Sequence, residues 1–438
     1  MEDFRSNLKS QMPNRSLSDQ NSKTLILITN HFPYGLAESF LEHEIDYLKK
    51  GFDRVIILCR DVTSEAVRNV NFDCIIYRVD PQSSFSEKLL TAGLFIRHFK
   101  KLWMYLREES DALRSNKKKV TWEIFQVMIH DLTKAITTSH HLEKIIQQHV
   151  VQGKVWLYSY WLTSSALATT FVKVKPAIGL RKFSRVHGGD VYEYRNNLHY
   201  LSFRYTLSKH LDHIYSISKS GQDHLEKIIR SSPKNKISVS RLGVPGIGFT
   251  PEKNERNFLL VSCSFLLPVK QVNLIIESIA LVENFNLNWI HIGDGPLRTE
   301  LEALASLKLG GKKNIQYQFM GSVSNVALLQ FYAAKFVDLF VNTSASEGIP
   351  VTMMEAQAHG IPILALDVGG VKEIVSANNG KLLPANASEE IIAEAIEEIQ
   401  TLDGNAYHTM RKNAFQSWQS HYNADQNFST FVAEILNL

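Results

Sequence analysis

The sequence predicts an α/β protein that contains two doubly wound parallel sheets. Short apolar, β-branched runs, typical of buried strands, alternate with longer segments of helical periodicity along most of the chain. A stretch rich in Pro, Gly and polar residues, 245–257, divides this pattern into two parts, and we expect a hinge there. At 438 residues the chain is long enough for two substantial domains.

Residues 337–375 predict the clearest Rossmann-like unit. A buried strand, Val337–Val341, passes through a polar loop, Asn342–Gly348, into a helix. Pro350 is expected at the first helical position, because its fixed φ suits that position and an N–H there would lack a helical partner anyway. A second strand, Ile361–Leu366, ends at a pair of glycines. This order of strand, loop, helix and strand is that of a βαβ unit.

Composition and charge are those of an ordinary soluble globular protein, with 44% apolar and 21% charged residues. The formal net charge of +4 gives no global polycation, so nucleic acid is not an expected partner. Three scattered cysteines without a C-x-x-C pair are expected as free thiols in a reducing cytosol. No apolar run is long enough for a transmembrane helix. The polar residues 1–22 contain no secretory signal and predict a disordered tail, so we expect a cytoplasmic protein.

Two carboxylates lie near the start of the helix that follows Pro350. Glu347 lies in the loop before this helix, and Glu355 lies about a turn and a half into it. Loops at the carboxyl edge of a parallel sheet bind ligands in such folds, and a helix N-terminus there favours phosphate. Since carboxylates accept hydrogen bonds from hydroxyls, the pattern indicates a ligand with phosphate and polyol groups. The alternative is that Glu347 caps the helix and Glu355 is a surface charge.

The residue identities in this stretch are more specific than the spacing of its two carboxylates. SEGIPVTMMEA, followed by GIPILALDVGGVKEIV, resembles the nucleotide-sugar-binding signature of glycosyltransferase family 4, with its E-x(7)-E motif. The resemblance covers most of the chain from about Leu25 to Leu383 and is to the type found in bacterial exopolysaccharide and lipopolysaccharide synthesis. It implies a GT-B fold, in which two Rossmann-like domains face a central cleft, and a transfer that retains the anomeric configuration.

The GT-B resemblance and the composition together predict the domain boundaries. After the tail, residues 23–244 are expected to form the acceptor-binding domain and residues 258–415 the nucleotide-sugar-binding domain, on either side of the hinge. The C-terminal residues 416–438 are expected to contain a helix that packs back toward the first domain.

The first strand, Thr24–Thr29, runs into a loop with Pro and Gly, and a helix is expected over Glu38–Lys50. The loop is similar to one that faces the acceptor and the donor phosphates in family 4. The family often has a double glycine in this place, whereas this chain has only Gly35. The resemblance makes Gly35 and Glu38 candidate acceptor-binding residues. Glu38 is alternatively a helix-capping acid.

Strands expected at Arg54–Cys59 and Asp73–Val79 precede a long helical segment, 84–150. In its basic part, 85–119, apolar residues recur at helical spacing with Arg and Lys between them. This pattern is typical either of a helix packed on the core with a solvated face or of a helix that lies on an anionic membrane. Many members of the resembling family act on lipid-linked acceptors, which adds weight to the second alternative, a peripheral position on the inner membrane face, while the first remains open.

Phe183–Gly189 predicts a strand that enters a tight turn. The pattern R-x-H-G-x-D-x-Y around it is similar to the acceptor-side histidine motif of the family. The resemblance implies that His187 is a catalytic residue at the anomeric centre of the sugar and that Asp190 contacts the acceptor. The alternative for a histidine at the end of a strand is a structural role.

The second domain is expected to begin with a strand, Phe258–Cys263, whose loop leads to Lys270. Family members commonly read G-R-L-x-x-x-K-G here, with Arg and Lys on the donor diphosphate. In this chain Phe265 takes the place of the Arg and Gln271 that of the second Gly, while Lys270 is retained. Either another basic residue substitutes or donor binding is weaker.

The resemblance also assigns the other donor-site residues. Glu347 would contact the donor sugar and act in catalysis with Lys270, while Glu355 would hold the ribose hydroxyls. The N–H groups of Gly348 and Ile349 would reach the phosphates. The backbone of two glycine turns would hold the base and the ribose, through Gly293, Gly295, Met320 and Gly321.

Glycosyl transfer passes through an oxocarbenium-like state while negative charge grows on the diphosphate. The sequence has no D-x-D-like pair and no His/Cys cluster, so neither a metal nor a cofactor is indicated. We expect a retaining enzyme that moves a hexose or N-acetylhexosamine from a UDP- or GDP-sugar to a saccharide or lipid-linked saccharide. The alternatives are a non-catalytic sugar-nucleotide-binding subunit and an epimerase or hydrolase on the same fold.

Overall fold

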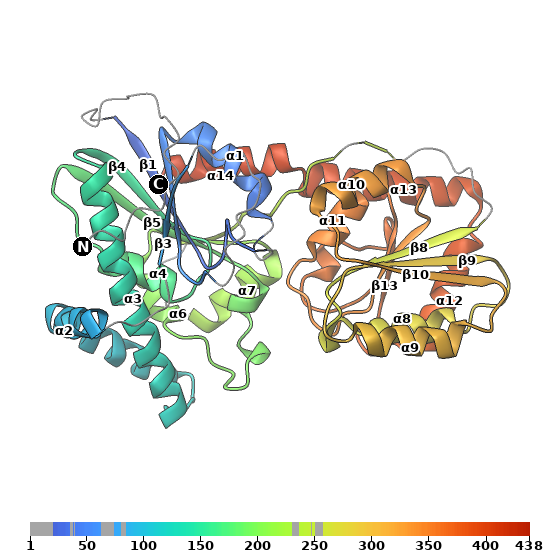
Figure 1. The fold of residues 1–438 in the computed structure, drawn as a ribbon, viewed down its shortest axis with the longest axis horizontal. Coiled ribbons are helices and arrows are strands. Elements are labelled where there is room, and N and C mark those ends of the chain that lie inside the picture. The colour runs from blue at the N-terminus through green and yellow to red at the C-terminus, as the bar shows by residue number, and fades with distance from the viewer. Residues whose placement is uncertain are drawn as a thin grey trace. The chain divides into compact units, whose positions relative to one another are not determined.

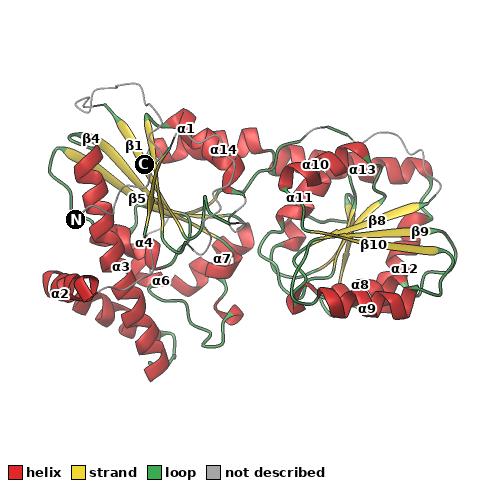
Figure 2. Ribbon diagram, viewed as in Figure 1, coloured by secondary structure: helices red, strands yellow, loops and turns green. Residues whose placement is uncertain are grey.

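The computed structural model describes residues 21–35, 38, 40–62, 74–79, 85–229, 236–246, 248–249 and 257–438, without the side chains of 85–88. Nearly all of the predicted tail and much of the predicted hinge lie outside these residues. The chain forms two compact units (Figures 1 and 2). Unit 1 comprises Met1–Tyr215, His224–Ser238 and Val432–Leu438, and unit 2 comprises Ser216–Asp223 and Val239–Phe431.

Unit 1 is built on a seven-stranded sheet of order β3-β2-β1-β4-β5-β6-β7. Its strands are β1 (Lys23–Thr29), β2 (Arg54–Cys59), β3 (Ile75–Arg78), β4 (Gly153–Ser159), β5 (Ile178–Val186), β6 (His213–Ser216) and β7 (Ile237–Val239). The pairs of β1 with β2 and with β4 are parallel, so the chain winds outward in both directions from β1. After Lys23, every residue of β1 is buried, which explains its unbroken apolar run.

Two layers of helices cover this sheet (Figure 1). They are α1 (Leu41–Gly51), α2 (Phe85–Ser115), α3 (Trp122–His149), α4 (Ser164–Phe171), α5 (Gly188–Val191), α6 (Arg204–His210) and α7 (Lys219–Ile229), with a short 3₁₀ turn at Glu193–Arg195. The first helix buries Leu41, Ile45 and Leu48, which recur at helical spacing. On the other face α3 and α4 pack together, and α2 contributes Leu94, Leu102 and Tyr105 to the same core.

The predicted helix over Glu38–Lys50 begins three residues too early. Glu38 has a φ of 58°, in the left-handed region, so it cannot start a right-handed helix, and α1 begins at Leu41. The carboxylate of Glu38 turns back to the preceding loop instead of capping the helix.

Unit 2 is built on a six-stranded sheet of order β10-β9-β8-β11-β12-β13. Its strands are β8 (Phe258–Cys263), β9 (Leu287–Ile292), β10 (Ile315–Gly321), β11 (Leu339–Asn342), β12 (Ile363–Leu366) and β13 (Gly380–Leu383). All neighbouring pairs in this sheet are parallel. Both sheets therefore confirm the predicted α/β class with doubly wound parallel sheets.

The helices of unit 2 also form two layers (Figure 2). They are α8 (Val272–Ile279), α9 (Arg298–Leu309), α10 (Asn325–Ala334), α11 (Val351–Gln357), α12 (Glu389–Gln400) and α13 (Gly404–His421), with 3₁₀ turns η2 (Pro268–Lys270) and η3 (Val371–Glu373). Pro350 precedes α11 as its N-cap and not as its first helical residue, because its ψ of 117° is extended. The sequence predicts Pro350 as the first helical residue, whereas the helix begins one residue later, at Val351.

The last helix, α14 (Ala424–Leu436), passes from unit 2 into unit 1. Its final turn docks on the sheet of unit 1, where the indole of Trp156 donates to the carbonyl of Ile435 at 2.7 Å. Val432 packs so closely on α1 that a Cβ at Gly51 would lie 2.3 Å from its Cγ1. None of the helices in the described part of the chain is long and apolar enough to cross a membrane.

Candidate active-site residues and their relatives

The loop after β8 is bound on both sides by neighbouring loops at the carboxyl edge of the unit 2 sheet. The N–H of Leu266 donates to the carbonyl of Asp294 at 3.0 Å, and the N–H of Ala345 donates to the carbonyl of Val269 at 2.8 Å. The loops after β8, β9 and β11 are therefore joined by backbone hydrogen bonds at the edge where parallel sheets bind ligands.

At this edge, the predicted glycines allow the backbones of neighbouring loops to lie very close to each other. Gly293 has a φ of 141°, donates to the carbonyl of Gly321 at 2.9 Å, and would bring a Cβ within 1.9 Å of the Ser264 carbonyl oxygen. A Cβ at Gly295 would lie 2.6 Å from the Leu266 carbonyl oxygen. A side chain at either glycine would separate the loops, so both positions require Gly.

Lys270 and Glu347, the two charged residues of unit 2 that were predicted to act in catalysis, are paired with each other. The ammonium Nζ of Lys270 lies 2.6 Å from Oε1 of Glu347, and both side chains are largely buried. Gln271, next to Lys270, has a φ of 46°, a left-handed conformation that favours the glycine found here in the resembling family. The hydroxyl of Thr343 donates to the carbonyl of Gln271 at 2.9 Å and holds this turn in place.

Glu355 is buried, so it is not the surface charge of the alternative interpretation. Burial raises the pKa of its carboxyl group to about 7, although a hydrogen bond from the side chain of Asn325 acts in the opposite direction. Asn325 starts α10, and its role was not foreseen because nothing in its local sequence indicates which residue of α11 it faces.

The position at which the resembling family has an Arg is occupied by an apolar, exposed side chain. Phe265 is 60% exposed, and Leu267 and Val269 on the same loop are also exposed. A basic residue lies close by: Nη1 of Arg298 would be 3.1 Å from a Cβ placed on Gly321. Arg298 pairs with Asp294 at 2.8 Å and with Glu302 at 2.8 Å. The sequence offered one signal for it, a basic residue directly after the glycine turn.

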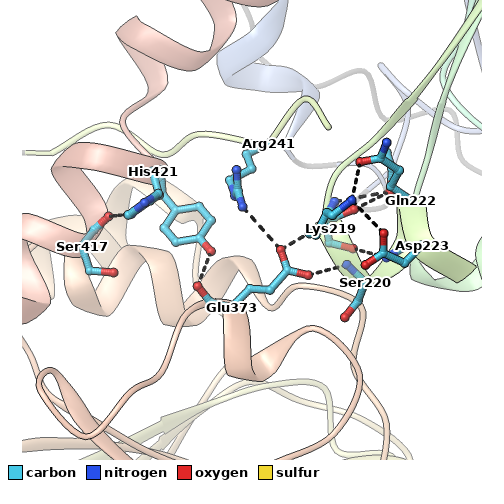
Figure 3. A network of polar contacts seen from close by, with 12 residues as sticks. Lys219, Ser220, Gln222, Asp223, Arg241, Glu373, Ser417 and His421 are labelled. Atoms are coloured by element: carbon cyan, nitrogen blue, oxygen red, sulfur yellow. Dashed lines mark hydrogen bonds and ion pairs between the residues drawn. The ribbon is translucent and has the colours of Figure 1, made fainter. Parts of the chain in front are cut away.

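The glycine pair after β12 links the Glu347 loop to a second polar network. Gly370 donates to the carbonyl of Gly348 at 2.9 Å. Figure 3 shows the carboxylate of Glu373 between Arg241 and the start of α7. It accepts the N–H groups of Lys219 at 2.8 Å and Ser220 at 2.7 Å, and therefore caps α7 from a distant part of the chain.

The predicted acceptor-side residue Glu38 is fully engaged by unit 1. Its carboxylate accepts the N–H groups of Asn30 at 3.1 Å, His31 at 2.8 Å and Phe32 at 2.7 Å, and the indole N–H of Trp161. Gly35, in the same loop, has a φ of 62°, which favours glycine. Glu38 thus shapes the loop that the sequence analysis assigned to the acceptor.

Asp190 clamps two strand ends together. One carboxylate oxygen accepts the N–H of His187 at 2.5 Å, and the other accepts the N–H of Leu162 at 2.6 Å. The guanidinium of Arg204 donates to the backbone carbonyls of Asp190 and Leu162. Asp190 is buried, and burial raises its pKa to about 6 in spite of these interactions.

The imidazole of His187 lies in an aromatic box. Its ring centroid is 4.6 Å from those of Tyr160 and Trp161, and 5.8 Å from that of Phe40. The side chain is 5% exposed, yet neither ring nitrogen has a hydrogen-bond partner among the described residues. Buried polar atoms without a partner are uncommon and mark a site where a ligand can supply one.

The structure thus groups the predicted residues by unit. The donor-side residues Lys270, Gly293, Gly295, Met320, Gly321, Glu347, Gly348, Ile349 and Glu355 belong to unit 2, and the acceptor-side residues Gly35, Glu38, His187 and Asp190 belong to unit 1. The described residues contain no group of three or more His, Cys, Asp or Glu side chains that could hold a metal ion.

Comparisons with known proteins confirm the fold and indicate a class of protein. Residues 247–417 match the family model described as glycosyl transferases group 1. Among solved structures, the apo form of the lipopolysaccharide outer core galactosyltransferase WaaB superposes with a TM-score of 0.65 at 15% identity, covering 94% of this chain and 99% of that one. Anabaena Alr3699/HepE in complex with UDP and glucose gives a TM-score of 0.64 at 16% identity, with the same coverage. The predicted GT-B fold is confirmed.

The description of one relative names a biosynthetic role, which the description of the family model does not. The "Putative colanic acid biosynthesis glycosyltransferase WcaL" of Escherichia coli (strain K12) is 26% identical over 253 residues. The match covers 54% of this chain and 59% of WcaL, so this chain spans less than two thirds of that protein's length. Together with the family model, this similarity supports placing the chain in the glycosyltransferase superfamily.

Proposed function

We propose that this protein is a retaining glycosyltransferase of family 4. It would transfer a hexose or N-acetylhexosamine from a UDP- or GDP-sugar to a saccharide or lipid-linked saccharide in polysaccharide or glycoconjugate synthesis. The observation that carries the proposal is the position of Lys270, Glu347 and Glu355 within the matched residues 247–417 of unit 2. The colanic acid description of WcaL supports a role in polysaccharide synthesis, and the UDP and glucose in the HepE structure support a UDP-linked donor.

In the proposed donor complex, the diphosphate competes with Glu347 for Lys270. The ammonium and the carboxylate are 2.6 Å apart without a ligand, so a diphosphate that approaches Lys270 must loosen this pair. Glu347 then becomes free to accept hydroxyls of the donor sugar, while N–H groups of Gly348 and Ile349 reach the phosphates. Lys270 stabilises the negative charge that grows on the leaving diphosphate.

The structure offers a candidate for the cation that Phe265 does not supply. Arg298 lies beside the Gly321 turn, at the same sheet edge as Lys270. Its guanidinium already pairs with two carboxylates, so it would reach a phosphate or ribose only by exchanging one of them. No metal and no resident cofactor is part of the proposal.

His187 would contact the donor sugar at its anomeric centre, with the acceptor hydroxyl attacking the face from which the diphosphate leaves. We assign no covalent nucleophile. The conformation of His187 is fixed by Asp190 and the aromatic box, and its ring nitrogens are unclaimed among the described residues. Both features suit a group that must hydrogen-bond to a substrate in one orientation.

The first test is a thermal-shift screen of UDP-, GDP- and ADP-sugars on the wild type and on Lys270→Ala. Stabilisation by one nucleotide class that is lost in Lys270→Ala supports the donor site and identifies the base. Lys381→Ala is the matched control, because Lys381 also pairs with a glutamate, Glu398, but does so away from the proposed site. No stabilisation by any sugar nucleotide, with or without oligosaccharide acceptors, would contradict the proposal.

A second test separates transfer from binding. Glu347→Ala should still bind the nucleotide and should lose sugar transfer to an acceptor, since its carboxylate acts on the donor sugar. A wild type that binds sugar nucleotides but transfers nothing would favour the non-catalytic subunit. A wild type that converts a sugar nucleotide without an acceptor would favour an epimerase or hydrolase.

We also propose that α2 lies on an anionic membrane. Leu89, Ile96, Phe99 and Trp103 are 65–81% exposed and follow one stripe at helical spacing. Lys100 and Arg107 are exposed four residues after Ile96 and Trp103, so basic groups flank the stripe. The opposite side of α2 packs on the core, so the proposal concerns only its exposed face.

Vesicle flotation tests this contact. Binding to vesicles of phosphatidylglycerol and phosphatidylcholine, but not of phosphatidylcholine alone, is expected for the wild type and should be lost in the double variant Ile96→Glu/Phe99→Glu. Leu307→Glu, an equally exposed position on α9, should bind as the wild type does. Equal binding of all three proteins would contradict the proposal.

A further inference from the structure

Trp161 connects two groups of the acceptor-side site that the sequence analysis treated as independent. Its indole N–H donates to the Glu38 carboxylate, and its ring packs against the imidazole of His187 with a centroid distance of 4.6 Å. The angle between the two ring planes is 49°, so the indole forms a side wall of the aromatic box and does not stack parallel to the imidazole.

The backbone around Trp161 is fixed as firmly as its side chain. The hydroxyl of Ser159 donates to the carbonyl of Trp161 at 2.6 Å. The next residue, Leu162, donates its N–H to the same Asp190 carboxylate that accepts the N–H of His187. Asp190 therefore ties the backbone of the Trp161 segment to that of His187, and Glu38 fixes the indole.

The other walls of the box come from different elements. Phe40 precedes α1 and lies nearly parallel to the imidazole, at an interplanar angle of 22°, and Tyr160 at the end of β4 also packs on Phe40. Neither wall provides a hydrogen bond to the ring nitrogens. The box therefore restrains the plane of the imidazole by contact, and both buried nitrogens are without a hydrogen-bond partner among the described residues.

We propose that Trp161 is a positioning residue for His187: tethered to Glu38, it holds in one orientation an imidazole whose nitrogens have no hydrogen-bond partner among the described residues. This inference rests on the proposed function, in which His187 contacts the substrate. Trp161 itself is assigned no contact with the substrate.

The electrostatic surroundings agree with this geometry. Burial lowers the pKa of His187 well below its ordinary value, and the charge of Arg185 acts in the same direction. Arg185 forms a fully buried ion pair with Glu44 at 2.5 Å. The other ionisable groups around the box or the His187 backbone are Glu38, Tyr160, Asp190 and Arg204. A neutral imidazole has one donor and one acceptor nitrogen, as contact with a sugar hydroxyl requires.

The test measures the titration of His187 in the full chain by NMR of labelled histidine, with His187→Gln used for assignment. In the wild type, the midpoint of the His187 titration should lie well below the ordinary pKa of histidine. In Trp161→Leu, water enters the box and the midpoint should move toward about 6.5, the ordinary pKa of histidine. Trp161→Phe keeps an aromatic wall without the tether and should give an intermediate midpoint.

Activity provides a second readout, because the acidic limb of kcat/KM should move in parallel with the His187 midpoint. Trp161→Leu should then lose about tenfold more activity at pH 5.5 than at pH 8 relative to the wild type. Trp156→Phe is the matched control: it also loses an indole hydrogen bond, to the Ile435 carbonyl, but does not touch the box.

An unchanged His187 titration in both Trp161 variants would overturn the inference. A wild type that transfers no sugar would refute the proposed function instead, and the NMR titration would still decide on the box.

Discussion

At the residue scale, Glu355 is a carboxyl group whose burial costs the ligand-free protein stability. Its carboxyl group is buried on α11, and the described structure gives its Oε1 one hydrogen bond, from Asn325. Folding must therefore desolvate a charge at neutral pH, and this raises the pKa to about 7. A ribose that donated hydroxyl hydrogen bonds would compensate for the lost water.

Replacing Glu355 by Gln should stabilise the ligand-free protein above neutral pH. The carboxyl group has a folded pKa of about 7 against an ordinary 4.5, so the folded state binds the extra proton between these values. The free energy of unfolding of the wild type should consequently fall as pH rises from 4.5 to 7, whereas Glu355→Gln lacks this loss. We expect a gain of about 1–3 kcal/mol at pH 8 and little at pH 4.5, measured by urea unfolding. Glu300→Gln, on the exposed surface of α9, should gain nothing at either pH.

The affinity for the donor should have the opposite pH dependence. The ionised carboxylate accepts ribose hydroxyls and its protonated form does so less well, so wild-type affinity should fall as pH drops below about 7. Calorimetric titration with the nucleotide identified by the screen should show a decrease approaching tenfold per pH unit well below this pKa. Glu355→Gln should bind more weakly at pH 8, with a flat pH profile. Equal pH profiles of the two proteins would show that Glu355 does not contact the donor.

The sequence was a good guide to which residues lie near the sheet edge and a poor guide to what each one contacts. Lys270, Glu347 and Gly293 all lie on the loops that the apolar runs and glycine turns predicted. The Lys270–Glu347 pair joins residues 77 positions apart, and the partner of Glu355 is on another helix. Such pairings depend on how loops and helices far apart in the sequence pack together, which local periodicity does not contain.

At the element scale, strands were easier to predict than helix starts. Strands of a sheet covered on both faces are buried and mostly apolar, as β1 and β11 are, so their runs are visible in the sequence. Helix starts depend on backbone conformation at single residues. Glu38 is left-handed and Pro350 is extended, and either residue type also occurs in the first turn of a helix, so the sequence alone placed both helix starts wrongly.

Gln271 is a left-handed residue at the N-cap of α8, and Gln271→Gly should stabilise the protein. A side chain at a φ of 46° is strained, whereas glycine adopts this conformation freely. After the greater chain entropy of glycine in the unfolded state is subtracted, we expect a net gain of about 0.5 kcal/mol in urea unfolding. Gln271→Ala keeps the Cβ and should give no gain. Destabilisation by glycine equal to or greater than that by alanine would contradict the strain argument.

The cap that Glu373 provides should control the stability of the first turn of α7. In Glu373→Ala the N–H groups of Lys219 and Ser220 lose their acceptor (Figure 3). Their amide hydrogen exchange should become faster, and the free energy of unfolding should fall by about 0.5–2 kcal/mol. Lys372→Ala, at the exposed neighbouring position, should change neither quantity. Unchanged exchange at Lys219 and Ser220 in Glu373→Ala would show that water or another group replaces the cap.

At the scale of the whole molecule, the chain does not divide at one hinge. Unit 1 takes its last seven residues from the C-terminal end of the chain, and α7 and α14 each contribute to both units. The chain enters the long segment of unit 2 at Val239, so the composition change near 245–257 falls within unit 2 and not at a crossing between the units. The return of α14 carries no compositional signal, and in the sequence analysis it followed only from the family resemblance.

Two units with separate sheets and cores should unfold in two calorimetric transitions, since two-state behaviour is expected only of single domains. A sugar nucleotide should raise the transition of unit 2, which holds the proposed donor-binding residues, more than that of unit 1, by an amount that grows with ligand concentration. Deleting residues 432–438 should lower the transition of unit 1, because it removes the buried Ile435 and the acceptor of the Trp156 indole. Trp156→Phe should lower the same transition by less, as one hydrogen bond is worth about 1 kcal/mol. A single transition that moves with both the ligand and the deletion would show that the two units unfold as one cooperative body.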